Sequence, residues 1–136
     1  MTTTLWLRIA SVISFLFTAG HGLGGRQDWS PMGDNEVLRA MRAVRFETMG
    51  ASRTYYDFFM GFGHSLTLAM LLQSVLLWQL ATIAKAGSAP VRPMIGAFIV
   101  ASAVGSLVTW RFILPLPAVF SLVLTACLLA AFFARR

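Results

Sequence analysis

The sequence is short of charged side chains, and shortest of acidic ones. Only 12% of its 136 residues are charged, and five Asp and Glu residues stand against eleven Lys and Arg. A soluble domain of this size carries about twice that charged fraction, so the composition argues against one. The basic residues lie mainly in loops and at predicted helix ends, where anionic headgroups are their natural counterpart. We therefore expect membrane lipids as partners and no nucleic acid, despite the net charge of +6.

Cysteine and the common nucleotide-binding motifs are also scarce. Cys127 is the only cysteine, which excludes an intrachain disulfide, an all-cysteine metal site and haem attached through Cys-x-x-Cys-His. A P-loop, a serine-centred elbow and a dinucleotide-binding glycine motif are missing from the sequence. Gly61-Phe62-Gly63 lies inside an apolar run and lacks the strand–turn–helix context of such motifs. From the motifs alone we expect no cofactor.

Long hydrophobic runs are abundant. Hydrophobic residues make up 57% of the sequence, and the mean hydropathy is +0.73. A bilayer-spanning helix needs about 20 mostly apolar residues. Four windows reach that length, at about residues 5–23, 56–83, 94–113 and 118–134. They predict an all-α polytopic membrane protein, a left-handed four-transmembrane-helix bundle that forms a single membrane domain over residues 1–136.

Two further questions concern the first span: whether it is a cleaved signal peptide, and on which side of the membrane its N-terminus lies. Arg8, an apolar run and Thr18-Ala19-Gly20 loosely imitate a secretory signal, but cleavage there would separate His21 from its helix, so we expect an uncleaved span. With the N-terminus inside, five basic residues lie on the inner side and six on the outer side, which does not decide the topology. We expect an integral protein of the bacterial inner membrane with both termini cytoplasmic.

The segment of about residues 31–50 predicts an amphipathic interfacial helix between the first two spans. Ser30-Pro31 or Asp34 would cap its start, and Gly50 would stop it. One face repeats at helical spacing and carries Val37, Leu38, Met41, Val44 and Thr48, while another carries Arg39, Arg42 and Arg45. The three arginines form either a solvated or lipid-facing stripe or a binding surface for an anionic substrate.

Small and polar residues recur on two of the predicted spans. The first span carries a polar stripe on one helical face, at Ser11, Ser14, Thr18 and His21. The third span repeats small residues at every fourth position, at Ala97, Ala101, Gly105 and Thr109. Such ladders permit close approach of helices in a membrane. A turn at Leu114-Pro115-Leu116-Pro117 then leads into the fourth span.

Several polar residues fall at one depth of the predicted bundle. At ~1.5 Å per residue, His21, His64 and Trp110 lie about 24, 27 and 25 Å along their antiparallel helices. Asp57 is one heptad from His64 on the same face, and Gly61 between them leaves room for a ligand or another helix. The predicted ligand-binding residues around this layer are Tyr56, Trp110, Arg111, Glu47 and Arg53.

The candidate catalytic residues of this layer are His64, Asp57 and His21. His64 would transfer a proton, Asp57 would orient it, and His21 would be a second acid or base or a polar anchor. A purely structural role is also possible for three of the candidate site residues, namely His21, Asp57 and Arg111. His21 is able to bond a nearby backbone group, Asp57 to form a salt bridge with Arg53 or Arg111, and Arg111 to anchor its helix by snorkelling.

Two metal-based alternatives are weaker. Two histidines at one depth, His21 and His64, are able to ligate a haem axially. A protein-only metal site would need a third ligand such as Asp57, and the heptad offset makes that awkward. We therefore predict no metal site, with haem as a minor alternative.

The sequence resembles two known families, one through several of its segments and one only in general features. The first is an uncharacterised family of small bacterial four-helix membrane proteins. The resemblance is carried by the runs Arg45-Phe46-Glu47-Thr48-Met49-Gly50 and Arg53 to Gly63, by His21-Gly22-Leu23-Gly24-Gly25, and by Trp110-Arg111 with the proline turn that follows. That resemblance implies the scaffold and no chemistry. A looser likeness, to the EXPERA group with its sterol isomerases and ligand-binding receptors, rests on helix number and residue content. It implies a lipid-like ligand and assigns no catalytic residue.

Two functions follow from these patterns. In the first, a pocket binds an apolar, lipid-like molecule with one polar group, and acid–base chemistry of isomerase or hydrolase type acts on it. In the second, the protein is a non-enzymatic accessory or scaffold subunit, alone or as a homo-oligomer, and its polar stripe and small-residue ladder are helix–helix contacts. A transporter is less favoured, because no span is broken by proline at mid-membrane.

Overall fold

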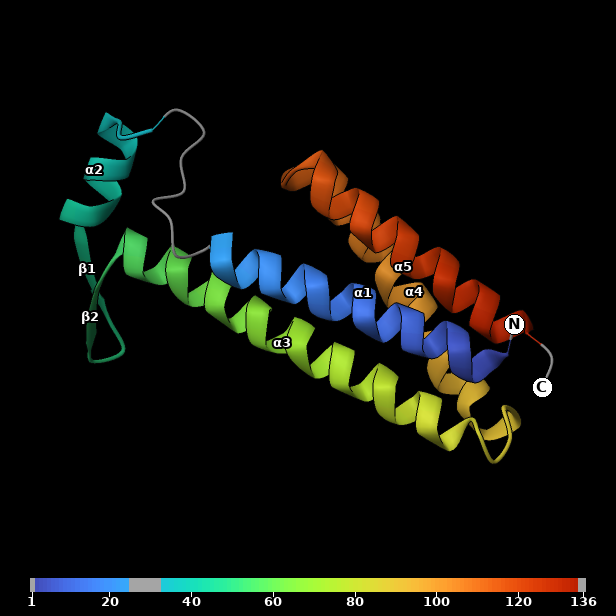
Figure 1. Ribbon diagram of the computed structural model, residues 1–136. Helices are drawn as coiled ribbons and strands as arrows, with labels where there is room; N and C mark the ends of the chain where they lie inside the picture. Colours follow the sequence, from blue (N-terminus) through green and yellow to red (C-terminus); the bar gives the residue numbers. More distant parts are fainter. Residues whose placement is uncertain (1, 25–32, 135–136) are drawn as a thin grey trace. The chain divides into compact units, whose positions relative to one another are not determined.

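A computed structural model of the protein describes residues 2–24 and 33–134. Four of its helices are long and apolar enough to cross a membrane, and a short helix stands between the first two (Figure 1). The long helices are α1 (Thr3–Gly24), α3 (Tyr55–Ile83), α4 (Arg92–Phe112) and α5 (Pro115–Phe133), and the short one is α2 (Glu36–Ala43). The mostly helical, four-span architecture predicted from the apolar runs is confirmed. A one-turn 3₁₀ helix, η1 (Ala89–Val91), precedes α4.

The fourth span begins earlier than its apolar window. Helix α5 starts at Pro115 and continues through Pro117, because residues in a first helical turn have no intrahelical acceptor for their N–H groups. Leu114 is the extended residue before it, as the steric effect of the following proline requires. The proline-rich turn between the last two spans is therefore reduced to two residues, Ile113 and Leu114.

The interfacial helix is much shorter than predicted, because the chain changes to β structure after Ala43. Strand β1 (Arg45–Thr48) pairs with strand β2 (Ala51–Thr54) in an antiparallel hairpin. Met49 and Gly50 form its two-residue turn, with φ values of 50° and 76°. Positive φ at both positions is typical of the type I′ turn, whose twist suits a hairpin. Gly50 is thus a turn residue and not the predicted helix stop.

The cap of α2 also differs from the prediction. Asn35 is the N-cap, and its side-chain oxygen accepts a hydrogen bond of 3.0 Å from the Leu38 N–H. Asp34, the residue predicted as cap, instead forms an exposed ion pair with Arg39 at 3.2 Å. Leu38 is the buried residue of this short helix. The other predicted cap, Ser30-Pro31, lies outside the described residues.

The chain divides into two compact units. The first unit contains the chain up to Phe17 and from Met70 onward, and the second contains Thr18–Ala69. In the first unit, a core of apolar side chains joins α1, the end of α3, α4 and α5. Its largest fully buried members are Leu7, Leu77, Ile95, Leu128 and Val91.

Helices α4 and α5 lie side by side and antiparallel in the first unit (Figure 1). Thr125 Oγ1 donates to Ser102 Oγ at 2.8 Å, and the space beside Gly96 is occupied by the Phe132 ring. Ala97 and Ala101 of the predicted small-residue ladder are exposed, whereas Ser106 is buried. The contact face of α4 is therefore rotated from the ladder, and the ladder does not pack within this chain at Ala97 and Ala101.

Candidate functional site

The last turns of α1 hold His21 against α3 within the second unit. His21 Nδ1 lies 2.8 Å from Thr67 Oγ1, and Thr67 Oγ1 donates to the Gly63 carbonyl at 2.9 Å. A hydroxyl has one proton, so with that proton on the Gly63 carbonyl, Nδ1 of His21 is the donor to Thr67. His21 is therefore a contact between α1 and α3, and its second ring nitrogen has no hydrogen bond to residues 2–24 or 33–134.

The two helices come close together at this contact. A Cβ atom added to Gly22 would lie 3.2 Å from Thr67 Cγ2, closer than ordinary van der Waals contact. Gly22, next to His21, thus lets the backbone of α1 approach the Thr67 side chain. The sequence alone did not predict this packing role of Gly22.

His64 has different surroundings from His21. It is exposed on α3, and in residues 2–24 and 33–134 no hydrogen bond reaches its ring. A Cβ atom added to Gly61 or to Gly63 would have nothing within 4 Å, so the surface beside His64 is open. The hydrogen-bond partner of His21 is Thr67, about one helical turn beyond His64.

Asp57 is part of a reciprocal helix cap. Its Oδ2 atom accepts from the Thr54 N–H at 2.9 Å, and Thr54 Oγ1 accepts from the Asp57 N–H at 3.0 Å. This is the capping-box arrangement, with Asp57 in the place of the usual Glu. The one ion pair found in the described part of the chain joins Arg39 and Asp34, so the predicted salt bridges of Asp57 are not formed there. The carboxylate serves to start α3.

An aromatic cluster lies where the hairpin meets α3. Phe46 packs 5.2 Å from Tyr55 and 5.7 Å from Phe58, and Phe58 packs edge-to-face on Phe62 at 4.9 Å. Edge-to-face pairs at such distances are favourable beyond their buried area. Sequence reasoning missed this cluster. The spacing of four between Phe58 and Phe62 was a usable signal, but Phe46 joins them only through the hairpin.

The remaining predicted residues of the second unit also have local roles. Tyr56, predicted as a pocket wall, carries the Arg42 guanidinium over its ring at 4.8 Å. Arg53 donates to the Ser52 carbonyl at 2.7 Å, and Glu47 is exposed on β1. Arg45 Nε donates to Ser52 Oγ at 3.3 Å. The structure brings Tyr56 to Arg42 but forms no described bond from either Glu47 or Arg53 to His64.

Trp110 and Arg111 belong to the first unit, at the end of α4. Trp110 is 68% exposed, and the Arg111 guanidinium lies 5.2 Å from the centre of the Phe112 ring. An exposed tryptophan and arginine at a helix end are the residues that anchor a span at the membrane interface. Their placement is compatible with the snorkelling alternative.

Serine side chains of α1 join it to α3 within the first unit. Ser11 Oγ donates to the Ser74 carbonyl at 2.7 Å, and Gln73 Nε2 donates to Ser14 Oγ at 3.2 Å. Ser11 and Ser14 are buried. The polar stripe of the first span therefore contributes helix–helix contacts, as the scaffold hypothesis predicts for these two positions.

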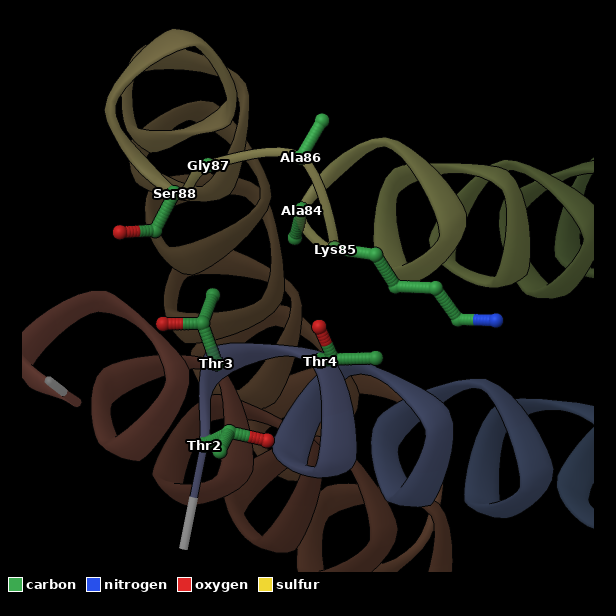
Figure 2. A pocket seen from close by; sticks show the side chains of 8 residues that line it. All are labelled: Thr2, Thr3, Thr4, Ala84, Lys85, Ala86, Gly87 and Ser88. Atoms are coloured by element: carbon green, nitrogen blue, oxygen red, sulfur yellow. The ribbon is translucent and has the colours of Figure 1, made fainter. Parts of the chain in front are cut away.

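The described residues contain no group of three His, Cys, Asp or Glu side chains able to hold a metal ion. The two cavities described in the first unit are also lined by other residues than the predicted ones. One lies between the start of α1 and the α3–α4 connection (Figure 2), and the other lies between α1 and α3 beside Trp78.

Comparison with protein-family models, with curated proteins and with solved structures gave no match for this chain. The four long apolar helices support a small four-helix membrane protein.

Proposed function

We propose that this small four-helix membrane protein is a non-enzymatic accessory or scaffold subunit that associates with another membrane helix. The proposal rests on one observation: several of the predicted polar side chains form hydrogen bonds to other parts of the same chain. His21 bonds to Thr67, Asp57 caps the start of α3, and Ser11 bonds to the Ser74 carbonyl. Side chains held in this way stabilise helices, and they are poorly placed to move protons to and from a substrate.

The energetic scale of these contacts agrees with a structural role. Hydrogen bonds between membrane helices contribute about 0.6 kcal/mol on average and up to about 1.7 kcal/mol. Several such bonds, with the Ser102–Thr125 pair between α4 and α5, together give a meaningful fraction of the stability of a small membrane protein.

The exposed part of the α4 ladder supports association with a partner helix. Ala97 and Ala101 are exposed, and a Cβ atom added to Gly105 would have nothing within 4 Å. Small side chains on an uncovered face let a second helix approach closely. The partner in this proposal is a membrane helix, from a second copy or from another protein.

Native mass spectrometry of the detergent-extracted protein tests this proposal. We expect an oligomer or a hetero-complex for the natural sequence, and a monomer for Ala101→Leu, because leucine would hold the partner backbone away. Val100→Leu adds bulk at a neighbouring exposed position outside the ladder and should leave the complex intact. A natural protein that is monomeric and without a partner would contradict the scaffold function.

The second candidate function is binding of an apolar, lipid-like molecule with one polar group, with isomerisation or hydration by acid–base chemistry at His64. A specific observation favours it, namely an exposed imidazole inside a candidate span beside the open surface at Gly61 and Gly63. Tyr56, Glu47 and Arg53 of the same unit are the proposed ligand-contacting residues. Asp57 would act through its effect on the start of α3.

The same preparation distinguishes the second candidate from the first. A retained lipid-sized mass that disappears in His64→Ala, and persists in the exposed neighbour Ser65→Ala, would support ligand binding. Unfolding of His64→Ala, with the ligand still bound to the folded fraction, would instead assign His64 a structural role. A Soret band in the absorption spectrum would identify His21 and His64 as haem ligands.

A further inference from the structure

In the first unit, α1 and the end of α3 lie side by side (Figure 1), and an open groove of about 420 Å³ lies between them. The groove is lined from α1 by Ser11, Val12 and Phe15, and from α3 by Ser74, Val75, Trp78 and Gln79. None of these residues belongs to the layer of histidines or to the α4 ladder considered above. The groove is therefore a separate candidate site.

The apolar part of this lining is uncovered. Val12, Phe15 and Val75 are each about half exposed, and all three lie within candidate membrane spans. The buried serines beside them are already satisfied, because Ser11 Oγ donates to the Ser74 carbonyl at 2.7 Å and Ser74 Oγ donates to a carbonyl of its own helix at 2.7 Å. A groove with apolar walls and no unsatisfied serine hydroxyl suits an acyl chain.

A cation stands at the Trp78 end of the groove. The Arg8 guanidinium lies 5.1 Å from the centre of the Trp78 ring, and Arg8 precedes Val12 by four residues, so both lie on one face of α1. Arg8 is five residues after the start of α1 at Thr3, and Trp78 is five residues before the end of α3 at Ile83. Both therefore lie about 7.5 Å inside the ends of their helices. Tryptophan at such a depth is typical of the membrane interface, where lipid headgroups begin.

The charge of Arg8 has no counterpart in the first unit. Its Nε atom is buried without a hydrogen-bond partner, and the only ion pair in the part of the chain that the structure describes joins two residues of the second unit. All five acidic residues of the sequence lie between positions 28 and 57, so the first unit contains none. An arginine within a membrane span is costly unless it is paired. Charge complementarity therefore favours an anion from outside this unit.

We infer that this groove binds an anionic phospholipid, whose acyl chain lies along the apolar lining and whose phosphate accepts hydrogen bonds from the Arg8 guanidinium. Because Nε is enclosed by the protein, the two Nη groups are the donors to the phosphate. The exposed Gln79 amide at the same end is able to donate to a second headgroup oxygen. The inference is independent of the proposed scaffold function, because the groove shares no residue with the α4 ladder or with His64.

Native mass spectrometry of the full-length protein, released from mixed nanodiscs, tests this inference. The nanodiscs contain equal amounts of phosphatidylglycerol, which is anionic, and phosphatidylcholine, which is zwitterionic, with the same acyl chains. We expect a retained lipid on each chain, enriched in phosphatidylglycerol. Equal retention of the two lipids, or a protein chain bound with no retained lipid, overturns the inference. The oligomeric state is read separately from the same spectrum, so failure of the scaffold function would be recognised by itself.

Two matched variants test the headgroup contact. Arg8→Gln should lower the enrichment of phosphatidylglycerol by about tenfold, since it removes hydrogen bonds between two charged groups. Arg92→Gln removes the same charge at an exposed position that does not line the groove, and it should leave the enrichment unchanged. Equal losses in the two variants would reduce the preference to diffuse attraction and overturn the site. Unchanged enrichment in a folded Arg8→Gln protein would also overturn it.

A second pair of variants tests the acyl-chain contact and leaves Arg8 in place, so it decides the question even if Arg8→Gln does not fold. Val75→Trp fills the groove from its exposed α3 side and should remove most of the retained phosphatidylglycerol. Val119→Trp adds the same bulk at an exposed position of α5 that does not line the groove, and it should retain the lipid. Full retention in Val75→Trp would overturn the groove as the acyl-chain site.

Discussion

The His21 imidazole and the Thr67 hydroxyl lie 2.8 Å apart and join the end of α1 to α3. The Thr67 hydroxyl is bonded in turn to the Gly63 carbonyl, so the contact is anchored to the α3 backbone. His21, predicted as a second acid or base or as a polar anchor, is thus a contact between two candidate spans.

Removal of this contact should lower stability. We expect His21→Ala and Thr67→Val each to reduce the free energy of unfolding by about 0.5–2 kcal/mol. The double variant should lose less than the sum of the two, because both single changes remove one shared bond. Reversible unfolding in mixed detergent micelles, followed by circular dichroism, measures these differences.

His64→Ala provides the matched control for that experiment, since it removes the other histidine at an exposed position. It should change the free energy of unfolding by less than about 0.5 kcal/mol. Strict additivity of His21→Ala and Thr67→Val would show that the two side chains do not interact.

Loss of the cap at Asp57 should destabilise the start of α3. Asp57→Ala and Thr54→Ala each remove one half of the reciprocal bonds between these residues, with an expected cost of about 1 kcal/mol. Hydrogen exchange of the amides in the first turn of α3 should become faster, because the helix frays from that end.

Asp57→Asn separates the cap from a catalytic role, since an amide oxygen still accepts from the Thr54 N–H but cannot act as a carboxylate base. We expect near-normal exchange rates in this variant. If a lipid substrate is found and Asp57→Asn abolishes its turnover with a stable α3, the carboxylate has a chemical role as well.

The hairpin turn should respond in opposite directions to two substitutions. Gly50 has a φ of 76°, so Gly50→Ala imposes a left-handed conformation on a residue with a Cβ atom and should cost about 1–2 kcal/mol. Met49 already adopts a φ of 50°, and Met49→Asn should stabilise the turn, because Asn tolerates that region better. The amide exchange rates of β1 and β2 report both effects, and a stabilising Gly50→Ala would contradict the assigned turn.

The spans were predictable from the sequence because length and apolar content are local properties. All four predicted windows correspond to long helices, and the helix ends differ from the predicted ends by at most three residues. Prolines account for the largest shift, since Pro115 and Pro117 fit into the first turn of α5 and do not exclude it from the helix.

The hairpin was missed because its residues satisfy two periodicities. Val44 and Thr48 are four residues apart, as on one face of a helix, but both are β-branched, and Phe46 alternates with polar neighbours as in a strand. The turn residues Met49 and Gly50 decide the outcome, and a glycine is equally typical of a helix end. The local sequence pattern therefore did not distinguish a longer helix from a hairpin.

For the candidate site, the sequence predicted which residues share a helix face, but not which residues of a neighbouring helix they contact. Spacing placed Ser11, Ser14 and His21 on one face of α1, and in each unit the residues concerned contact α3. Spacing could not identify Thr67 as the partner of His21, since no local rule gives the rotation of a neighbouring helix. The same limit explains why the exposed side of α4, with Ala97 and Ala101, was predicted as a contact face.

The junction at Thr54 has a mechanical consequence. Strand β2 ends at Thr54 and α3 begins at Tyr55, with no linker between them (Figure 1). Thr54 is paired with Arg45 in the hairpin and bonded to Asp57 in the helix, and the Tyr55 N–H reaches back to the Val44 carbonyl. A force on the hairpin, such as that from the docking of another molecule, therefore acts directly on the first turn of α3, because no flexible linker separates the two.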